Sequence, residues 1–154
     1  KMIISGVACD KDTARIAVMG IPDKPGHAFR LFSLLANNGI NVDIILQSIG
    51  HDDVRDISFT IKRGQLDAAM QILEENKDRL HFTSFSGKSD LAKVSVVGAG
   101  MTSTPGVAAK LFDALASAQV NIRMISTSEI KISVLIDEAD ATRAVRAVHD
   151  KFFN

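Results

Sequence analysis

The spacing of apolar positions changes along the chain and then repeats. Residues 16–20 form a near-continuous apolar run, which is typical of a buried strand, and a short loop with two prolines follows at residues 21–26. From residue 28 to residue 36 the apolar positions take the spacing of one helix face, and an Asn-Asn-Gly sequence ends the helix. The pattern therefore predicts a strand, a tight loop and an amphipathic helix in succession.

The same periodicity divides the rest of the chain into elements. Before the first loop, an apolar segment predicts a strand at residues 1–9. After the first helix, the patterns predict a hairpin at 41–49 and 56–62, a helix at 66–76, a strand at 81–86 and a linker at 88–93. The second half predicts a strand at 94–98, a helix at 106–118, a hairpin at 120–126 and 131–137, and a closing helix at 139–152.

The two halves are copies of one design. Pro25-Gly26 and Asn41 recur 80 positions later as Pro105-Gly106 and Asn121. Each copy has the order β-α-β-β-α of a ferredoxin-like sandwich, but the second reaches the last residue without a fourth strand. We expect the strand at residues 2–8 to complete it. The predicted fold class is α+β, with a first module (15–88) inserted within a second (1–14 plus 89–154), side-by-side antiparallel sheets, and helices on one face.

Composition narrows the class of function. The 154 residues include 18 basic and 18 acidic side chains and neither Trp nor Tyr, which argues against a nucleic-acid partner. No apolar run is long enough for a membrane helix, so we expect no membrane partner and a cytoplasmic location. Cys9 is the only cysteine, which excludes an internal disulfide. We expect it to be a small buried hydrophobe, with an exposed thiol as the alternative.

The strand-to-helix loops are the first candidates for chemistry. Such a loop places free backbone N–H groups and the positive end of the helix dipole together, and Gly26 or Gly106 lets a ligand approach the backbone. This arrangement favours a carboxylate, and Asp23 adds a negative side chain suited to an ammonium group. The first loop could thus bind an α-amino acid, whereas the second offers only hydroxyls at residues 102–104. From these features alone, Pro-Gly could also serve only to start each helix.

Other clusters favour structural interpretations. No histidine has a second histidine or a cysteine at ligand spacing, so we expect no metal site, and His51-Asp52-Asp53 is interpreted as a solvated hairpin turn. The polar segment 126–129 is either another turn or a contact with a ligand or subunit. There is no nucleophile elbow, P-loop or complete dinucleotide fingerprint, so we expect no catalytic residue in this chain.

Several segments together resemble one family. They are GVACDKDTARIAVMGIPDKPG, GINVDIILQSI, DISFTI, KVSVVGAGM, PGVAAKLFDAL and ISTSEIKISVLID. They are similar to the C-terminal regulatory region of aspartate kinase (aspartokinase), a tandem pair of ACT modules, over nearly the whole chain. The resemblance implies the inserted topology described above.

The resemblance also implies a function. Enzymes of this family phosphorylate the side-chain carboxylate of aspartate with ATP, on the route to lysine, threonine and methionine, and their ACT modules mediate feedback inhibition by lysine, threonine or both. The glycine-rich start of the kinase is absent here, so the chain resembles the regulatory part alone and is not expected to be an enzyme by itself. It would hold no cofactor, because ATP and Mg belong to the kinase domain. Expected partners are an amino-acid effector, the catalytic domain or subunit, and a second copy in a homodimer. The alternative is a free-standing ACT amino-acid sensor that acts on another partner.

The family's effector sites can be transferred residue by residue. The first falls on Asp23, Lys24, Pro25, Gly26, His27, Ala28 and Gln47, with Asn121 and Ile122 completing it from the second module. The second would use Asp43, Met101, Thr102, Ser103, Thr104, Pro105, Gly106, Val107, Ser126, Thr127, Ser128 and Glu129. This chain departs from the family at Thr102, where a basic residue is usual, at Thr104, where His is frequent, and at Ser48-Ile49-Gly50, where Asn-Val-Ser is common.

Overall fold

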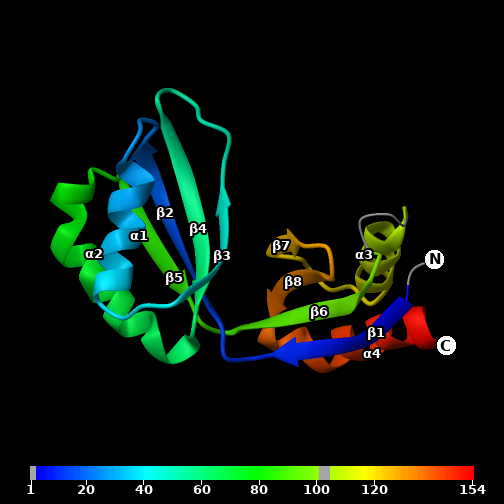
Figure 1. The fold of residues 1–154 in the computed structure, drawn as a ribbon. Helices are drawn as coiled ribbons and strands as arrows, with labels where there is room; N and C mark the ends of the chain where they lie inside the picture. Colours follow the sequence, from blue (N-terminus) through cyan, green and yellow to red (C-terminus); the bar gives the residue numbers. More distant parts are fainter. Residues whose placement is uncertain (1–2, 101–104) are drawn as a thin grey trace. The chain divides into compact units, whose positions relative to one another are not determined.

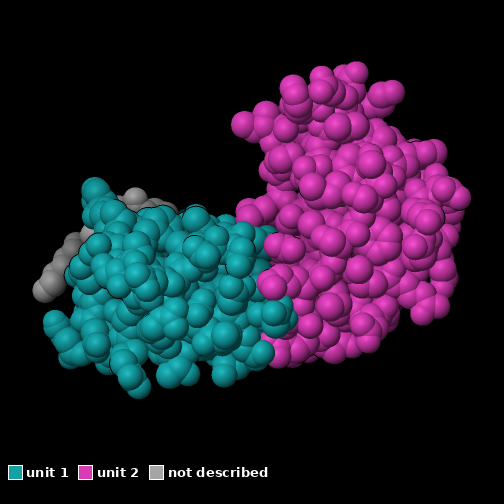
Figure 2. Space-filling view, turned by 180° about the vertical axis from the view of Figure 1, so that it is seen from behind, with its two compact units in different colours: residues 1–11, 90–154 teal, residues 12–89 magenta. Residues whose placement is uncertain are grey.

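The chain forms two four-stranded antiparallel sheets, each with two helices packed on it (Figure 1). The structure, a computed structural model, describes residues 3–100 and 105–154. They divide into two units, which Figure 2 shows in different colours: unit 1 comprises residues 1–11 and 90–154, and unit 2 comprises residues 12–89. No helix in the described ranges is long and apolar enough to cross a membrane.

Unit 2 has the sheet order β3-β4-β2-β5. Its elements are β2 (Ala14–Pro22), α1 (His27–Asn37), β3 (Val42–Gln47), β4 (Val54–Ile61), a 3-10 turn (Arg63–Gln65), α2 (Leu66–Leu80) and β5 (Ser84–Lys88). Along β2, Ala14, Ile16 and Val18 are buried, whereas Arg15 and Ala17 between them are only partly buried. This alternation directs one face of the sheet toward α1 and α2.

Unit 1 has the sheet order β1-β6-β8-β7. Its elements are β1 (Ile3–Asp10), β6 (Leu91–Ala99), α3 (Val107–Ser117), β7 (Met124–Thr127), β8 (Lys131–Asp137), a 3-10 turn (Glu138–Asp140) and α4 (Ala141–Phe153). The strand β1 pairs antiparallel with β6, so that Val7 lies opposite Val96. The N-terminal strand therefore completes the sheet of the unit that contains the C-terminus. The predicted insertion of one ferredoxin-like module within the other is confirmed.

Equivalent positions of the two copies build the two cores. Leu31 and Leu35 of α1 are almost fully buried in unit 2, and Leu111 and Leu115 of α3, 80 positions later, are fully buried in unit 1. Each such side chain stabilises its unit by about 1.5–3 kcal/mol relative to an exposed position. The duplication in sequence is thus a duplication of the core.

Two predicted segments differ from the structure between α2 and β6. Helix α2 continues past residue 76 to Leu80, because Leu80 lies seven positions after Leu73 on the same buried face. His81, predicted to begin a strand, instead ends α2 with a φ of 59°, and β5 begins later. The predicted linker at 88–93 was wrong: Lys88 ends β5 and Leu91 begins β6.

The predicted burial of Cys9 was also wrong. Cys9 is exposed. It lies near the end of β1, which is an edge strand of the unit 1 sheet. Fewer neighbouring elements therefore cover it than would cover a residue on a central strand. Partial burial raises the pKa of its thiol; the nearby Lys11 lowers this pKa by a smaller amount, and Asp10 raises it. The raised pKa keeps this thiol protonated and weakly nucleophilic at neutral pH.

Candidate functional site

The loop between β2 and α1 opens the candidate site. Gly26 precedes the first residue of α1 with a φ of 95°, in the left-handed region that glycine adopts without the penalty of a Cβ atom. No side chain among the described residues caps this helix start. The first N–H groups of α1 therefore face out of the helix end, together with the positive end of its dipole.

A cavity of about 340 Å³ lies at this loop. It brings together six of the residues predicted for the first effector site: Asp23, Lys24, Pro25, Gly26, Ala28 and Gln47. Gln47 is the last residue of β3 and is paired with Ile57 of β4. The remaining lining residues are Ile21, Pro22, Arg55 and Ile57.

Arg55 is a lining residue of this cavity that sequence reasoning missed. Its guanidinium donates to the carboxylate of Asp23 across the cavity, and the two side chains are 27% and 34% exposed. On β4, Arg55 shares the alternating face of Ile57 and Phe59, which are buried. A charged residue on the inward face at the end of a strand, next to a loop with an acidic residue, was the signal that could have revealed the pair.

Hydrogen bonds to the β3–β4 hairpin hold the loop in place. The backbone N–H of Asp23 donates to the carbonyl of Asp53 at 2.7 Å, and the N–H of Gly20 donates to the carboxylate of Asp56 at 3.0 Å. Asp52 and Asp53 have φ values of 52° and 66°, as in the primed turns that match strand twist in hairpins. The interpretation of residues 51–53 as a hairpin turn is confirmed.

His27 belongs to the predicted site but does not line the cavity. Its ring faces His81 edge-on, with 6.3 Å between the ring centroids. Desolvation lowers the pKa of His27, and electrostatic interactions with Arg30, His81 and Lys24 lower it further. The imidazole is therefore neutral at pH 7 and supplies no charge to a ligand in the loop cavity.

The predicted second site is described only in part. Met101, Thr102, Ser103 and Thr104 lie outside the described residues. Pro105 and Gly106 are exposed, and Gly106 starts α3 with a φ of 89°, as Gly26 starts α1. The side chain of Val107 is packed in the unit 1 core, so that only its backbone could contact a ligand.

The remaining residues of the prediction are distributed over both units. Ser126 and Thr127 lie on β7, and Ser128 forms the following turn by donating its N–H to the carbonyl of Lys131 at 2.8 Å. Glu129 is exposed beside it. Asp43 lies on β3 in unit 2. In unit 1, Asn121 is exposed and Ile122 packs partly against the core, so the contribution of these two to the loop cavity stays a prediction.

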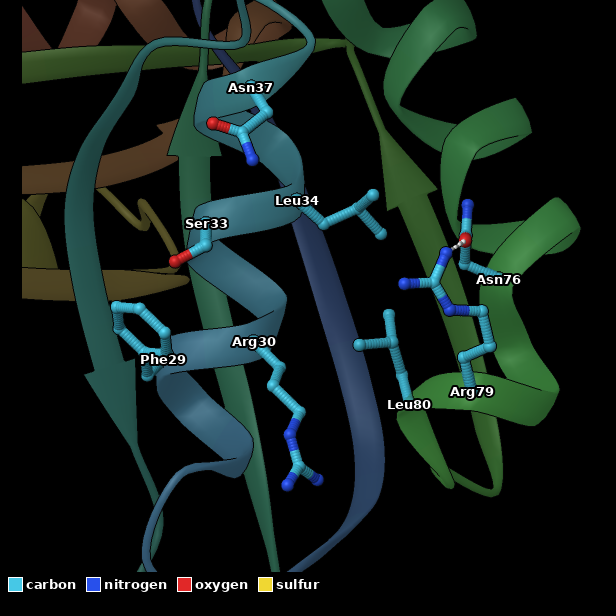
Figure 3. A pocket seen from close by; sticks show the side chains of 8 residues that line it. All are labelled: Phe29, Arg30, Ser33, Leu34, Asn37, Asn76, Arg79 and Leu80. Atoms are coloured by element: carbon cyan, nitrogen blue, oxygen red, sulfur yellow. Dashed lines mark hydrogen bonds between the residues drawn. The ribbon is translucent and has the colours of Figure 1, made fainter.

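Two larger cavities contain none of the predicted site residues. One, of about 450 Å³, lies between α1 and α2, where Figure 3 shows Leu34 and Leu80 pointing toward each other. Beside them, Arg79 donates to the side chain of Asn76 at 3.0 Å. The other, of about 470 Å³, lies between α4 and the end of β1. The cavity at the Asp23 loop, in contrast to these two, is lined by residues of the predicted effector site.

Within the described ranges, no group of three His, Cys, Asp or Glu side chains could hold a metal ion.

Comparison with known proteins shows a repeated family match. The family model described as "ACT domain" matches residues 16–76 and again residues 94–152. The chain is 45% identical over 150 residues to a protein named "Aspartate kinase" from Pseudomonas fluorescens and 47% identical over 147 residues to an "Aspartokinase" from Helicobacter pylori. The matches cover 97% and 96% of this chain but 36% of each relative. The chain thus spans about a third of the length of these relatives.

Two solved structures match the chain along nearly their whole length. One is the ligand-free regulatory subunit of aspartate kinase from Thermus thermophilus, with a TM-score of 0.91, 44% identity, and coverage of 97% of this chain and 98% of that chain. Another comes from a crystal structure of aspartokinase alpha and beta subunits, with a TM-score of 0.91, 46% identity, and coverage of 97% and 99%.

Proposed function

Because this chain belongs to the ACT-domain family and corresponds to the regulatory region of aspartate kinases, we propose that it is an amino-acid sensor whose effector binds at the Asp23 loop. The effector's binding would regulate the catalytic part of an aspartate kinase. The expected effectors are threonine, lysine or both, as end products of the route that aspartate kinase begins. ATP and Mg are assigned to the catalytic part.

The observation that carries this proposal is the composition of the loop cavity. An α-amino acid has a carboxylate and an ammonium group on one carbon atom. The uncapped start of α1 suits the carboxylate, because helix N–H groups and the helix dipole favour an anion. Asp23 and the side-chain oxygen of Gln47 line the same cavity and suit the ammonium group.

Regulation requires a second arrangement of the protein with a different affinity for the effector. A ligand shifts an equilibrium only by its differential affinity for the two states, so the effector must bind one arrangement of the regulatory and catalytic parts better than the other. The proposed partners are therefore a catalytic aspartate kinase domain or subunit and a second copy of this chain in a homodimer. The similarity to a regulatory subunit and to kinases nearly three times as long supports the catalytic partner. The expected cytoplasmic location stays a prediction.

The test is calorimetric titration of the chain with threonine and lysine, separately and together. We expect saturable binding of at least one of them. Replacing Asp23 with Asn should weaken that binding about tenfold, the lower end of the effect of a charged hydrogen bond, because Asp23 is partly exposed.

A matched control is Asp113→Asn, which removes an exposed carboxylate that pairs with Lys151 in unit 1. This variant should bind the effector as the unaltered chain does. Folded protein that gives no binding heat with either amino acid would contradict the proposed function.

A further inference from the structure

The loop cavity carries more positive than negative charge. Its lining contains one carboxylate, that of Asp23, and two cations, Lys24 and Arg55, while the other lining residues are uncharged. The start of α1 adds further positive potential. Among the described residues of this lining, Asp23 is the only carboxylate: it pairs with Arg55 and is also the group assigned to the ligand's α-ammonium.

The geometry holds Asp23 against Arg55. The backbone of Asp23 is tied to the β3–β4 hairpin by its N–H bond to Asp53, and Arg55 is on β4, directly across from Ile21. Gly50 closes the opposite side: a Cβ atom there would lie 2.1 Å from a carboxylate oxygen of Asp23 and 3.6 Å from a terminal nitrogen of Arg55. The ion pair fits because residue 50 has no side chain.

We propose that Arg55 determines the specificity of this cavity: by neutralising Asp23, it makes the cavity select an amino acid with an uncharged side chain over one with a cationic side chain. This inference rests on the proposed function, since it concerns the ligand of the same loop. A zwitterionic ligand with a neutral side chain adds no net charge to a lining with a net positive charge. A lysine side chain adds a second ammonium group near Lys24 and Arg55, and the described lining has no second carboxylate to receive it.

Two different roles of Arg55 lead to different results when Arg55 is replaced. If Arg55 neutralises Asp23, its removal exposes a negative charge and improves the binding of lysine more than that of threonine. If Arg55 instead binds the ligand's α-carboxylate, its removal weakens both ligands by the same factor, because both carry that carboxylate. The ratio of the two affinities distinguishes the roles.

The experiment is calorimetric titration of threonine and lysine into the unaltered chain and into Arg55→Gln. We expect the unaltered chain to prefer threonine, and Arg55→Gln to shift the affinity ratio about tenfold toward lysine. Arg55→Lys, which keeps the positive charge, should retain the original ratio, and it remains informative if the glutamine variant does not fold. The gain in lysine binding should vanish when Asp23→Asn is combined with Arg55→Gln, which would locate the gain at this cavity.

The matched control is Arg123→Gln, which breaks another arginine–aspartate pair, between Arg123 and Asp137 at 2.9 Å in unit 1. It should leave the ratio unchanged. If the ratio of threonine affinity to lysine affinity is unchanged in Arg55→Gln, including when both affinities fall by the same factor, the proposed role of Arg55 is overturned. In that case, threonine binding that is weakened by Asp23→Asn would leave the proposed function standing. Absence of binding by the unaltered chain would overturn both.

Discussion

At the scale of single residues, Asp23 is positioned by contacts from one neighbouring hairpin. Its N–H donates to Asp53, its carboxylate accepts from Arg55, and the backbone of Gly50 lies against that carboxylate. These three residues lie within a segment of six positions, about 30 positions after Asp23 in the sequence. A change at any of them should alter the loop cavity without touching the helix start.

Gly50→Ala tests this dependence. The added Cβ would overlap the carboxylate of Asp23, which must then turn away from its present position. We expect effector affinity, measured by calorimetry, to fall about tenfold through the loss of a positioned charged group. Gly64→Ala is the control, because a Cβ there meets nothing within 4 Å. Equal affinities in the two variants would show that the position of Asp23 has no effect on binding.

His27 should make the stability of unit 2 depend on pH. Its pKa is lowered, chiefly by desolvation and then by Arg30, His81 and Lys24, so the folded state binds a proton less readily than the unfolded state does. The resulting stabilisation is present above the ordinary histidine pKa of about 6.5 and is lost as pH falls through the lower folded-state pKa. In a pH series of thermal melts, His27→Gln should therefore lose less stability than the unaltered chain between pH 7 and 5. An NMR titration that places the His27 pKa at or above 6.5 would refute this expectation.

Single residues also mark where sequence reasoning stops. Asp23, Gly26 and Gln47 were predicted, because the loop and the family resemblance identify them without knowledge of the packing. Arg55 was missed because its partner is 32 positions away and only the β2–β4 register brings the two together. Cys9 was misassigned because residue type suggests burial, whereas its place on an edge strand decides exposure.

At the scale of elements, periodicity located every helix and strand but not all their ends. The strand at Lys131–Asp137 was predicted to the residue, since five consecutive buried positions lie between two charged ends. The element boundaries predicted for residues 77–93 were wrong, because charged residues there suggest loops. In the structure, those charges lie on the exposed side of α2, at the end of β5, at Asp90 between β5 and β6, and within β6 at Lys93.

The strand β1 offers a prediction at this scale. Ile4 and Val7 pack against the unit 1 core, and β1 pairs along the length of β6. Deleting residues 1–10 should therefore leave β6 as an edge strand, paired only with β8, and speed amide hydrogen exchange in β6 and α4. The amides of β2 and β4 serve as the internal control and should keep their protection. Faster exchange confined to unit 2 would contradict the topology.

At the scale of the whole molecule, one fold is used twice with different loop chemistry. Both helix starts have a glycine in the left-handed region, Gly26 and Gly106, so the backbone arrangement that favours an anion is present in each unit. The first loop adds a carboxylate and an arginine that pairs with it. We therefore assign amino-acid binding to the Asp23 loop, and the Thr102–Thr104 loop stays a second predicted site. Charge is balanced over the chain as a whole, with 18 basic and 18 acidic residues, but not within the cavity.

An effector site at the Asp23 loop can be tested by an NMR titration of the labelled chain with threonine, followed through the backbone amides. We expect saturable shifts in the amides of Asp23, Gly26, Ala28 and Gln47, which line one cavity. The same shifts should be strongly reduced in Asp23→Asn. Saturable shifts that spare these amides, or no shifts at threonine concentrations in the millimolar range, would contradict an effector site at this loop.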